Sequence, residues 1–215
     1  MNYFEEKRKE MVENLKKSGY LKDERIEKAM LKVKRELFVL PEYKEDAYVD
    51  TPLPIPGNAT ISAPHMHCIY LHALELKEND RVLEVGFGSG ILLAYIKEVI
   101  GKGEIFGIEI NPETFKFGKR NLRRAGYKDI KLILGDGSKG LENVQFDKIL
   151  VSAACPEIPK PLIEQLKPGG ILIAPVGSIS GNQELIKIKK NKKIKKENLG
   201  SVIFLPLLGK YGFRV

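Results

Sequence analysis

Residues 82–90 of this chain read VLEVGFGSG, and this segment limits the possible folds more than any other. The apolar residues before its first glycine predict a buried strand over 81–85, and the pattern after its last glycine predicts a helix over 90–100. A strand, a glycine turn and a helix in this order are typical of a nucleotide-binding βα unit. The turn is tight, and a ligand can lie against its backbone because three positions carry no side chain. These positions are Gly86, Gly88 and Gly90.

The glycine spacing is G-x-G-x-G and differs from the G-x-G-x-x-G with which dinucleotide sites seat a pyrophosphate on the helix end. The shorter form favours S-adenosylmethionine as the cofactor, with S-adenosylhomocysteine as its product. Glu84 lies inside the predicted strand and agrees with a cofactor that carries a positive charge. An ordinary tight turn between a strand and a helix is the alternative interpretation.

Acidic residues follow the next two predicted strands as well. Glu109, with Ile110 beside it, lies about 20 residues beyond the glycines and can accept hydrogen bonds from ribose hydroxyls. Asp136 can accept from an adenine amino group, and Gly137 leaves room for the ring. Because the carboxyl ends of parallel strands share one edge of the sheet, these residues predict one ligand across that edge. A solvated acid at Glu109 and a plain Asp-Gly turn at Asp136 are the alternatives.

Composition sets the class of protein. The chain has 215 residues, 43% of them hydrophobic and 30% charged, as expected for a globular domain with an added lobe. No apolar run approaches ~18 residues, and the N-terminal segment has no apolar core like that of a signal peptide. We therefore expect a cytoplasmic protein without a membrane partner. Cys68 and Cys155 are expected to be reduced core residues, and no metal site is predicted.

The net charge of +8 raises the possibility of a nucleic-acid partner. Much of this charge lies in the lysine-rich segment 187–196, which is predicted to form a two-stranded hairpin around Asn191. Lysines on an exposed sheet edge protect it from aggregation, and we expect this role and no nucleic-acid binding.

The order of elements predicts an α/β fold: a doubly wound, mostly parallel, Rossmann-like methyltransferase sheet with helices on both faces, an N-terminal helical extension and antiparallel C-terminal strands. The predicted strands span residues 81–85, 104–110, 130–135, 147–152, 171–176, 184–189 and 199–205, and the predicted helices span 65–76, 90–100, 112–125 and 161–166. We expect one domain over 1–215, divided into 1–60, 61–177 and 178–215.

The N-terminal part is expected to contain two amphipathic helices within residues 1–40, the second capped by Asp23 and ended by Pro41. Residues 43–60 contain several prolines and are expected to form a long irregular loop. A loop of this length in a compact domain is usually functional.

The end of that loop carries the most specific signal. ATISAPHMH, residues 59–67, resembles the most specific segment of the protein-L-isoaspartate (D-aspartate) O-methyltransferase family. Further similarity covers nearly the whole chain and includes VLEVGFGSG, GDG at 135–137, LKPGGILIAPVG at 166–177, GNQ at 181–183 and the FLPLLGKYGF ending. Phe87 departs from the family, which more often has a small residue such as threonine at this position.

The resemblance implies a protein repair methyltransferase. Such an enzyme transfers a methyl group from S-adenosylmethionine to the free α-carboxylate of L-isoaspartyl residues in damaged proteins. The ester collapses to a succinimide, and hydrolysis of that ring returns some normal aspartyl linkage. The resemblance also implies that Ser62 orients the substrate carboxylate as the catalytic-site residue, and that three neighbours line the cofactor: Thr60, Ile61 and His65.

Substrate contacts are expected at two further places. Val176 and Gly177, at a strand end, can offer backbone groups to an extended peptide, and Leu205 and Pro206 can add a wall. Ser62 could instead act only as the N-cap of the helix that begins near residue 65. His67 is expected to be a partly buried helix histidine, and His72 to be a surface residue.

Two other functions compete with the repair enzyme. A nucleic-acid methyltransferase would agree with the charge, but the segment 151–159, VSAACPEIP, has no Asn/Asp-Pro-Pro-Tyr/Phe motif to hold a base. A non-catalytic cofactor-binding module would not need the dense polar residues of 58–67. We therefore expect a monomeric enzyme whose partners are isoaspartyl proteins and peptides.

Overall fold

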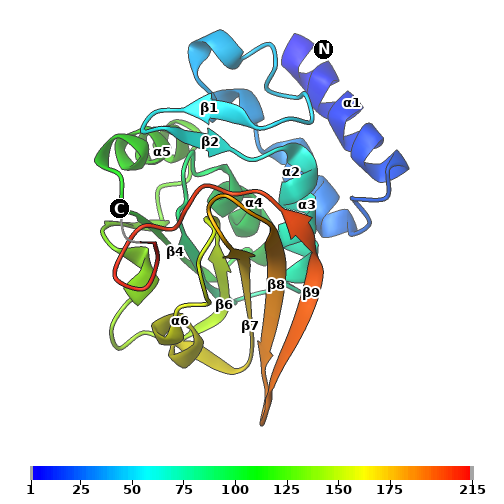
Figure 1. The fold of residues 1–215 in the computed structure, drawn as a ribbon. Coiled ribbons are helices and arrows are strands. Elements are labelled where there is room, and N and C mark those ends of the chain that lie inside the picture. The colour runs from blue at the N-terminus through cyan, green and yellow to red at the C-terminus, as the bar shows by residue number, and fades with distance from the viewer. Residues whose placement is uncertain (1, 214–215) are drawn as a thin grey trace.

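The computed structural model describes residues 2–213, which form a seven-stranded sheet between two layers of helices (Figure 1). The strand order is β5-β4-β3-β6-β7-β8-β9. Strands β3 to β7 are parallel to one another, whereas β8 pairs antiparallel with β7, and β9 antiparallel with β8. The strands are β3 (Arg81–Val85), β4 (Glu104–Glu109), β5 (Lys131–Leu134), β6 (Phe146–Val151), β7 (Leu166–Gly177), β8 (Gln183–Lys190) and β9 (Ile194–Val202). The predicted α/β class is confirmed.

Helices cover both faces of this sheet. One face packs against the larger hydrophobic cluster, which includes residues of five helices: α1 (Tyr3–Lys17), α2 (Glu24–Lys32), α3 (Pro64–Ala73), α4 (Ile91–Ile100) and α5 (Pro112–Arg124). The opposite face carries α6 (Lys160–Glu164), whose Leu162 is completely buried against Phe146 and Leu166 in a second cluster. Alternate residues of β3 divide between these clusters, with Val82 in the first and Leu83 in the second. The period-2 pattern of a strand thus produces the two-faced core.

The N-terminal extension differs from its prediction at the second helix. Asp23 is the predicted N-cap, and its side chain accepts from the Arg25 amide. The helix ends at Lys32 and does not continue to Pro41, because Val33 is extended with ψ 122°. Two short 3-10 helices follow, η1 (Arg35–Leu37) and η2 (Pro41–Tyr43).

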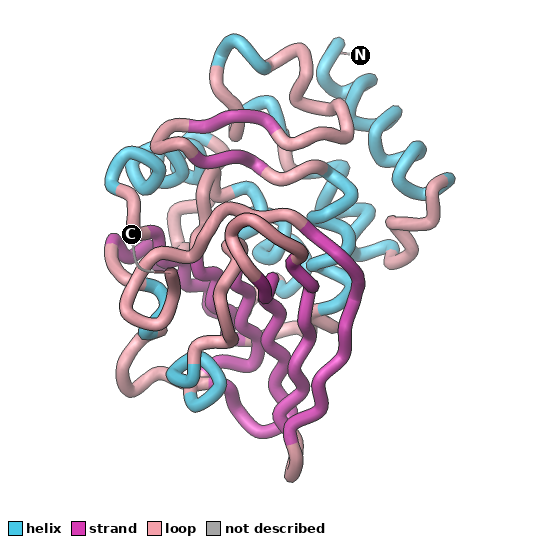
Figure 2. Tube along the Cα trace, in the orientation of Figure 1, coloured by secondary structure: helices cyan, strands magenta, loops and turns pink. Residues whose placement is uncertain are grey.

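The loop predicted over residues 43–60 is wrong in part, since it contains a small antiparallel hairpin. Its strands β1 (Leu53–Ile55) and β2 (Ala59–Ile61) pair with Pro54 opposite Thr60. A proline fits here because it lies on an edge strand and is exposed. Figure 2 shows this hairpin across the end of the sheet at which the parallel strands finish.

The lysine-rich hairpin is confirmed, but the last strand begins at Ile194 and not at residue 199. Residues of β9 are mostly exposed, so this edge strand lacks the apolar alternation from which a strand is predicted. On β8, Lys187 and Lys189 form ion pairs with Glu75, at 2.6 and 3.1 Å. Lys190 donates to three main-chain carbonyls near the end of α6: Ile163, Glu164 and Leu166.

Candidate active site

The strand order places a site at the carboxyl ends of β3 and β6. From β3 the chain proceeds outward to β4 and β5, and then returns to the other side of β3 with β6 and β7. This reversal is a topological switch point, where open α/β sheets bind ligands. The glycine turn leaves β3 at this point and Ser152 leaves β6.

Glycine is required in this turn for a different structural reason at each position. Gly86 has φ +80°, and an added Cβ would lie no closer than 3.8 Å to any atom of the protein, so its conformation requires glycine while its surroundings stay open. Gly88 has φ +53°. A Cβ on Gly90 would lie 2.8 Å from Leu122 Cγ, so this glycine allows α4 to pack against α5. Phe87 is buried and packs edge-on against Phe115, with ring centroids 5.7 Å apart.

Glu84 is buried just before this turn. One carboxylate oxygen, Oε1, accepts from the Ser152 hydroxyl at 2.8 Å, while Oε2 has no partner among residues 2–213. Burial raises the pKa of Glu84 to about 8, and the hydroxyl of Ser152 offsets only part of this effect. An unpartnered carboxylate oxygen in the core is suited to a ligand that brings positive charge.

Glu109 ends β4 on the other side of the glycine turn. Its Oε2 accepts from the Gly88 amide at 3.2 Å, and its Oε1 accepts from the Asn111 amide at 3.0 Å. These bonds fix the carboxylate at the sheet edge, where each oxygen keeps a further lone pair for a sugar hydroxyl. Ile110 follows with 39% of its surface exposed and offers an apolar contact beside it.

Asp136 lies at the same edge, after β5, but its carboxylate is already engaged. Oδ1 accepts from the amide and hydroxyl of Ser138, and Oδ2 accepts from the Lys210 amide at 2.9 Å. The C-terminal segment is thereby attached to this corner of the site. A Cβ on Gly137 would lie 2.5 Å from Val85 Cγ1. Glycine is therefore needed here for packing against β3, whether or not an adenine ring lies beside it.

The β1–β2 hairpin lies over the glycine turn and carries Ser62 at its end. An added Cβ on Gly88 would lie 3.5 Å from Ile55 Cδ1 and 3.9 Å from the Thr60 carbonyl oxygen. Thr60 is exposed, Ile61 is buried and Ser62 is half-buried. Ser62 is not a helix cap, because the N-cap of α3 is Ala63 and has no side-chain hydrogen bond.

The tip of the hairpin is attached to the start of α5. Thr114 Oγ1 donates to the Pro56 carbonyl at 2.8 Å, and Asn111 Nδ2 donates to the Gly57 carbonyl at 3.4 Å. Asn111 is also the N-cap of α5, accepting from the amides of Glu113 and Thr114. The same helix start therefore orients Glu109 and holds the hairpin.

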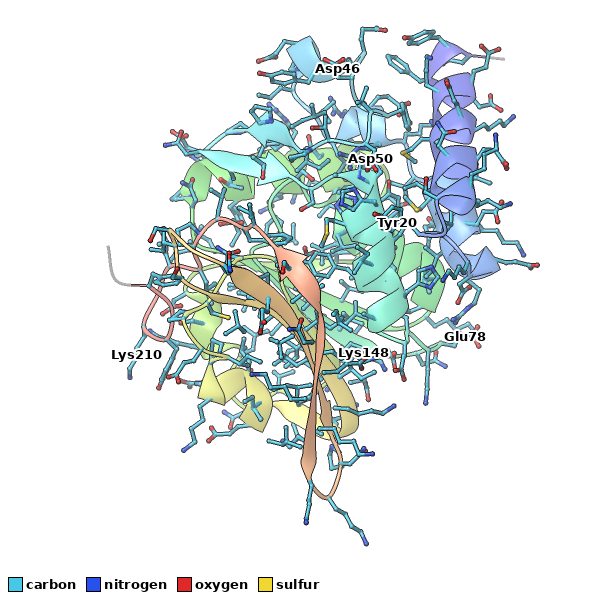
Figure 3. All side chains as sticks on the ribbon, turned by 45° about the vertical axis from the view of Figure 1, so that its right-hand side comes forward. Tyr20, Asp46, Asp50, Glu78, Lys148 and Lys210 are labelled. Atoms are coloured by element: carbon cyan, nitrogen blue, oxygen red, sulfur yellow. The ribbon has the colours of Figure 1, made fainter. Side chains whose placement is uncertain are left out.

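The base of the hairpin is held by Asp50 and Arg35. Asp50 Oδ1 accepts from the amide of His65 at 2.9 Å and lies 3.0 Å from its Nδ1; Figure 3 shows Asp50 at the N-terminal end of α3. His65 also contacts the Tyr20 ring, with centroids 5.2 Å apart. Arg35 donates to the Ser62 carbonyl at 2.9 Å.

The expected substrate residues meet around the segment that follows β6. The Ala154 amide donates to the Leu205 carbonyl at 2.8 Å, and Ala154 forms a bridge with Pro206. Cys155 forms a bridge with Val176, and the Gly177 amide donates to the Cys155 carbonyl at 3.0 Å. Leu205 is 46% exposed. The structure thus brings two distant chain segments together beside the switch point.

The remaining candidates have structural roles. His67 is buried, and burial lowers its pKa well below the usual value, which keeps the ring neutral. His72 was expected on the surface, but it is half-buried and its Nε2 accepts from the Lys22 amide at 3.2 Å. Cys68 and Cys155 are buried free thiols. Within residues 2–213, no group of three or more His, Cys, Asp or Glu side chains could hold a metal ion, and no helix is long and apolar enough to cross a membrane.

Comparison with known proteins shows the family of the chain. The family model of protein-L-isoaspartate(D-aspartate) O-methyltransferase (PCMT) matches residues 6–212. The chain belongs to this family. It is 53% identical over 212 residues to the protein-L-isoaspartate O-methyltransferase of Pyrococcus horikoshii, covering 97% of this chain and 96% of the relative. Protein-L-isoaspartate O-methyltransferase 2 of Archaeoglobus fulgidus is 47% identical over 215 residues, covering 98% of this chain and 97% of that protein.

Solved structures of the family have the same fold. A Plasmodium falciparum protein-L-isoaspartate O-methyltransferase in complex with S-adenosyl-L-homocysteine superimposes with a TM-score of 0.83 and 30% identity, covering 97% of this chain and 99% of that one. A second protein-L-isoaspartate O-methyltransferase gives a TM-score of 0.85 and 29% identity, covering 95% of this chain and 67% of the other. The predictions of family, fold class and enzyme class are confirmed.

Several residues that build this candidate site were not predicted from the sequence. Arg35, Asp50, Asn111, Thr114 and Ser152 each hold a candidate site residue or the hairpin that carries one. Only Asn111 had a local signal, since an asparagine directly before a proline and a helix is typical of an N-cap. The others act through contacts between distant segments, which a single sequence does not display.

Proposed function

We propose that this chain transfers a methyl group from S-adenosylmethionine to the free α-carboxylate of L-isoaspartyl residues in damaged proteins and peptides. A carboxylate oxygen forms a bond to the methyl carbon while the bond from that carbon to sulfur breaks. The products are a methyl ester and S-adenosylhomocysteine. The next main-chain nitrogen then displaces methanol to form a succinimide, and hydrolysis of that ring gives aspartyl and isoaspartyl linkages.

The candidate cofactor residues fit a ligand with a cationic end and a sugar diol. The unpartnered Oε2 of Glu84 and the open surroundings of Gly86 suit the methionine end, and the fixed carboxylate of Glu109 suits the ribose. Ile110, Asp136 and Gly137 are proposed to border the adenine, although Asp136 must share its oxygens with backbone amides. The proposed cofactor residues also include Gly88, Gly90, Thr60, Ile61 and His65.

Ser62 is proposed to orient the substrate carboxylate. This carboxylate is already ionised near pH 7, so the reaction needs no strong general base. Alignment of the reacting groups can contribute ~7–11 kcal/mol in favourable cases, and the Ser62 hydroxyl can supply part of it by donating to one carboxylate oxygen. Val176, Gly177, Leu205 and Pro206 are proposed to contact the peptide on either side of the isoaspartyl residue.

One observation carries this proposal. The half-buried Ser62 follows directly from a hairpin that packs on the Gly88 turn and is attached to the same helix start that orients Glu109. A hydroxyl is thus held beside the switch point, where it can donate to an acceptor oxygen. This arrangement suits transfer to an acceptor that is already nucleophilic.

Further proposals concern the setting of the enzyme. We propose a cytoplasmic monomer of one domain, with the segments 1–60, 61–177 and 178–215 as its N-terminal, cofactor-binding and C-terminal parts. We propose no nucleic-acid partner, because Lys187 and Lys189 pair with Glu75 and Lys190 binds main-chain carbonyls.

The proposed reaction can be tested by mass spectrometry of a synthetic peptide that contains one L-isoaspartyl residue. Incubation with the protein and S-adenosylmethionine should add the mass of one methyl group at that residue, and a succinimide should appear afterwards. An unchanged peptide, with S-adenosylhomocysteine binding intact, would contradict the proposed acceptor.

A further inference from the structure

Arg35 is the most unusual buried group near the site. Its side chain is completely buried, although charged side chains are almost never fully buried unless they are paired. Within residues 2–213, no carboxylate oxygen lies within 4.0 Å of its guanidinium nitrogens. Its hydrogen-bond partners are neutral: two main-chain carbonyls and the ring of His67. The carboxylate of Asp50 attracts its charge only from a longer distance.

Three guanidinium nitrogens face three different segments. Nε donates to the Ala47 carbonyl at 2.6 Å, and Nη2 donates to the Ser62 carbonyl at 2.9 Å. Nη1 lies 3.4 Å from His67 Nδ1, which must act as the acceptor because arginine has only donors. The neutral His67 required for this contact agrees with its lowered pKa. Arg35 therefore fixes the main chain at Ala47 and at Ser62.

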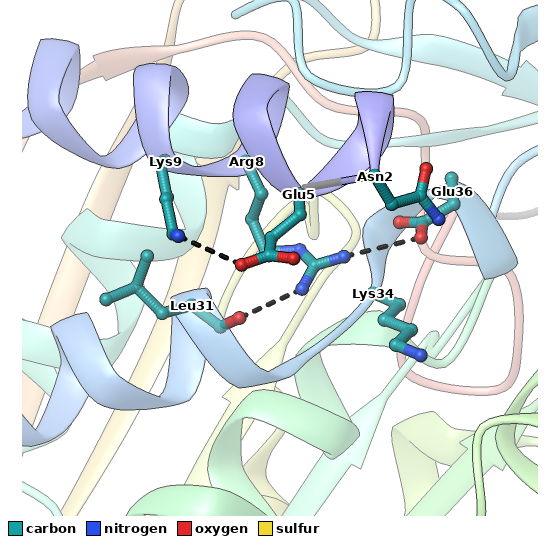
Figure 4. A pocket seen from close by; sticks show the side chains of 7 residues that line it. All are labelled: Asn2, Glu5, Arg8, Lys9, Leu31, Lys34 and Glu36. Atoms are coloured by element: carbon teal, nitrogen blue, oxygen red, sulfur yellow. Dashed lines mark hydrogen bonds and ion pairs between the residues drawn. The ribbon is translucent and has the colours of Figure 1, made fainter.

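Arg8 is another buried arginine, and its partners can be compared with those of Arg35. Arg8 is 7% exposed, pairs with Glu36 at 3.3 Å and donates to the Leu31 carbonyl (Figure 4). It also donates to the Tyr48 hydroxyl at 2.9 Å. Its charge is offset by a carboxylate. Among residues 2–213, no carboxylate contacts Arg35 in this way. Its guanidinium lies one hydrogen bond from the residue that is proposed to hold a negatively charged substrate.

We infer that Arg35 is a positioning residue for the methyl transfer: it fixes the Ser62 main chain and places a buried positive charge behind the substrate carboxylate. The inference rests on the proposed role of Ser62. Arg35 does not touch the glycine turn or Glu109 through any hydrogen bond, so its effect should appear in turnover and substrate affinity and leave cofactor affinity nearly unchanged. A low-dielectric environment strengthens the attraction between buried charges.

The test compares Arg35→Lys and Arg35→Gln with the matched variants Arg8→Lys and Arg8→Gln. Each is assayed for kcat and KM on an isoaspartyl peptide and for S-adenosylhomocysteine affinity by calorimetry. We expect Arg35→Lys to lower kcat at least ten-fold, because a single ammonium nitrogen cannot replace three nitrogens of a planar guanidinium that point to Ala47, Ser62 and His67. Arg35→Gln should also raise KM at least ten-fold, because the charge is lost.

The affinity of both Arg35 variants for S-adenosylhomocysteine should stay within three-fold of wild type, and both Arg8 variants should keep kcat within three-fold. Unchanged kcat in a folded Arg35→Lys protein would overturn the inference. So would a loss of cofactor affinity that parallels the loss of turnover, or an equal loss of turnover in the Arg8 variants. If neither Arg35 variant folds while the Arg8 variants do, Arg35 serves the fold as a whole and the inference also fails. Absence of turnover in the wild type would refute the proposed function instead.

Discussion

The main-chain amide of Gly88 donates a hydrogen bond to Glu109 Oε2 at 3.2 Å. This bond joins the glycine turn after β3 to the acidic end of β4, so it connects two parts of the proposed cofactor site. The Asn111 amide holds the other carboxylate oxygen, and the Asn111 side chain reaches the hairpin tip at Gly57. The geometry of the proposed methyl-donor site and the placement of the hairpin are thus physically linked.

Replacing Glu109 tests the sugar-binding role of this unit. We expect Glu109→Gln to weaken S-adenosylhomocysteine binding by about 10- to 100-fold, because hydrogen bonds to a charged group contribute ~1.5–3 kcal/mol. Glu113→Gln is the matched control, since Glu113 is exposed on the first turn of α5. Calorimetric titration measures both dissociation constants, and equal values for the two variants would remove Glu109 from the site.

Ser62→Ala should reduce kcat by roughly 10- to 100-fold, because a hydrogen bond to a charged carboxylate is lost. The melting temperature should stay unchanged, since Ser62 is not the N-cap of α3. Steady-state kinetics on an isoaspartyl peptide and calorimetry with S-adenosylhomocysteine separate the two effects. An equal loss of turnover and cofactor affinity would contradict a role confined to the substrate.

Much of this site follows from local pattern, and the rest does not. The glycine turn and Glu109 were predictable because a strand, a turn and a helix each leave a periodic signature within a few residues. Arg35 was not predictable, because its inferred positioning role depends on Ala47, Ser62 and His67, which the fold brings together. Gly137 shows a different limit: a glycine assigned to ring access is required by the nearby Val85 side chain.

The same distinction applies to the fold. The central parallel strands β3, β4 and β6 were predicted within one residue at each end, because they are mostly buried and read as apolar runs. The start of β9 was not predicted, because its exposed residues show no apolar alternation. The β1–β2 hairpin was predicted to be a loop because it is rich in proline. In both cases the pairing partner determines the strand.

Glu84 should make the stability of the ligand-free protein fall as pH rises. Its pKa is raised to about 8 from a model-peptide value of 4.5, so the folded state keeps a proton that the unfolded state loses. This contribution is fully present below about pH 4.5 and is lost as the pH rises through 8. Glu84→Gln is neutral at every pH and should lose less stability between pH 5.5 and 8. Thermal unfolding of both proteins at pH 5.5 and pH 8 measures this loss of stability. An equal loss in wild type and Glu84→Gln would refute the prediction.

Gly57→Ala tests the attachment of the hairpin. Gly57 has φ +82°, and an added Cβ would lie 2.3 Å from Thr114 Oγ1 and 2.8 Å from Asn111 Cγ. Gly19→Ala is the matched control, because Gly19 has φ +77° with nothing within 4 Å of an added Cβ. The control should lose about 1–2 kcal/mol from backbone strain alone. Gly57→Ala should lose more unfolding free energy than the control and should also bind S-adenosylhomocysteine less tightly. Equal unfolding free energies of the two variants, with unchanged affinity, would show that attachment of the hairpin tip has no effect on the site.

The most direct test of the central claim uses tritiated S-adenosylmethionine and two peptides that differ only in one L-isoaspartyl or L-aspartyl linkage. The account predicts a base-labile methyl ester on the isoaspartyl peptide alone. If neither peptide is labelled while cofactor binding is intact, or if both are labelled equally, the isoaspartyl carboxylate is not the acceptor that this site selects.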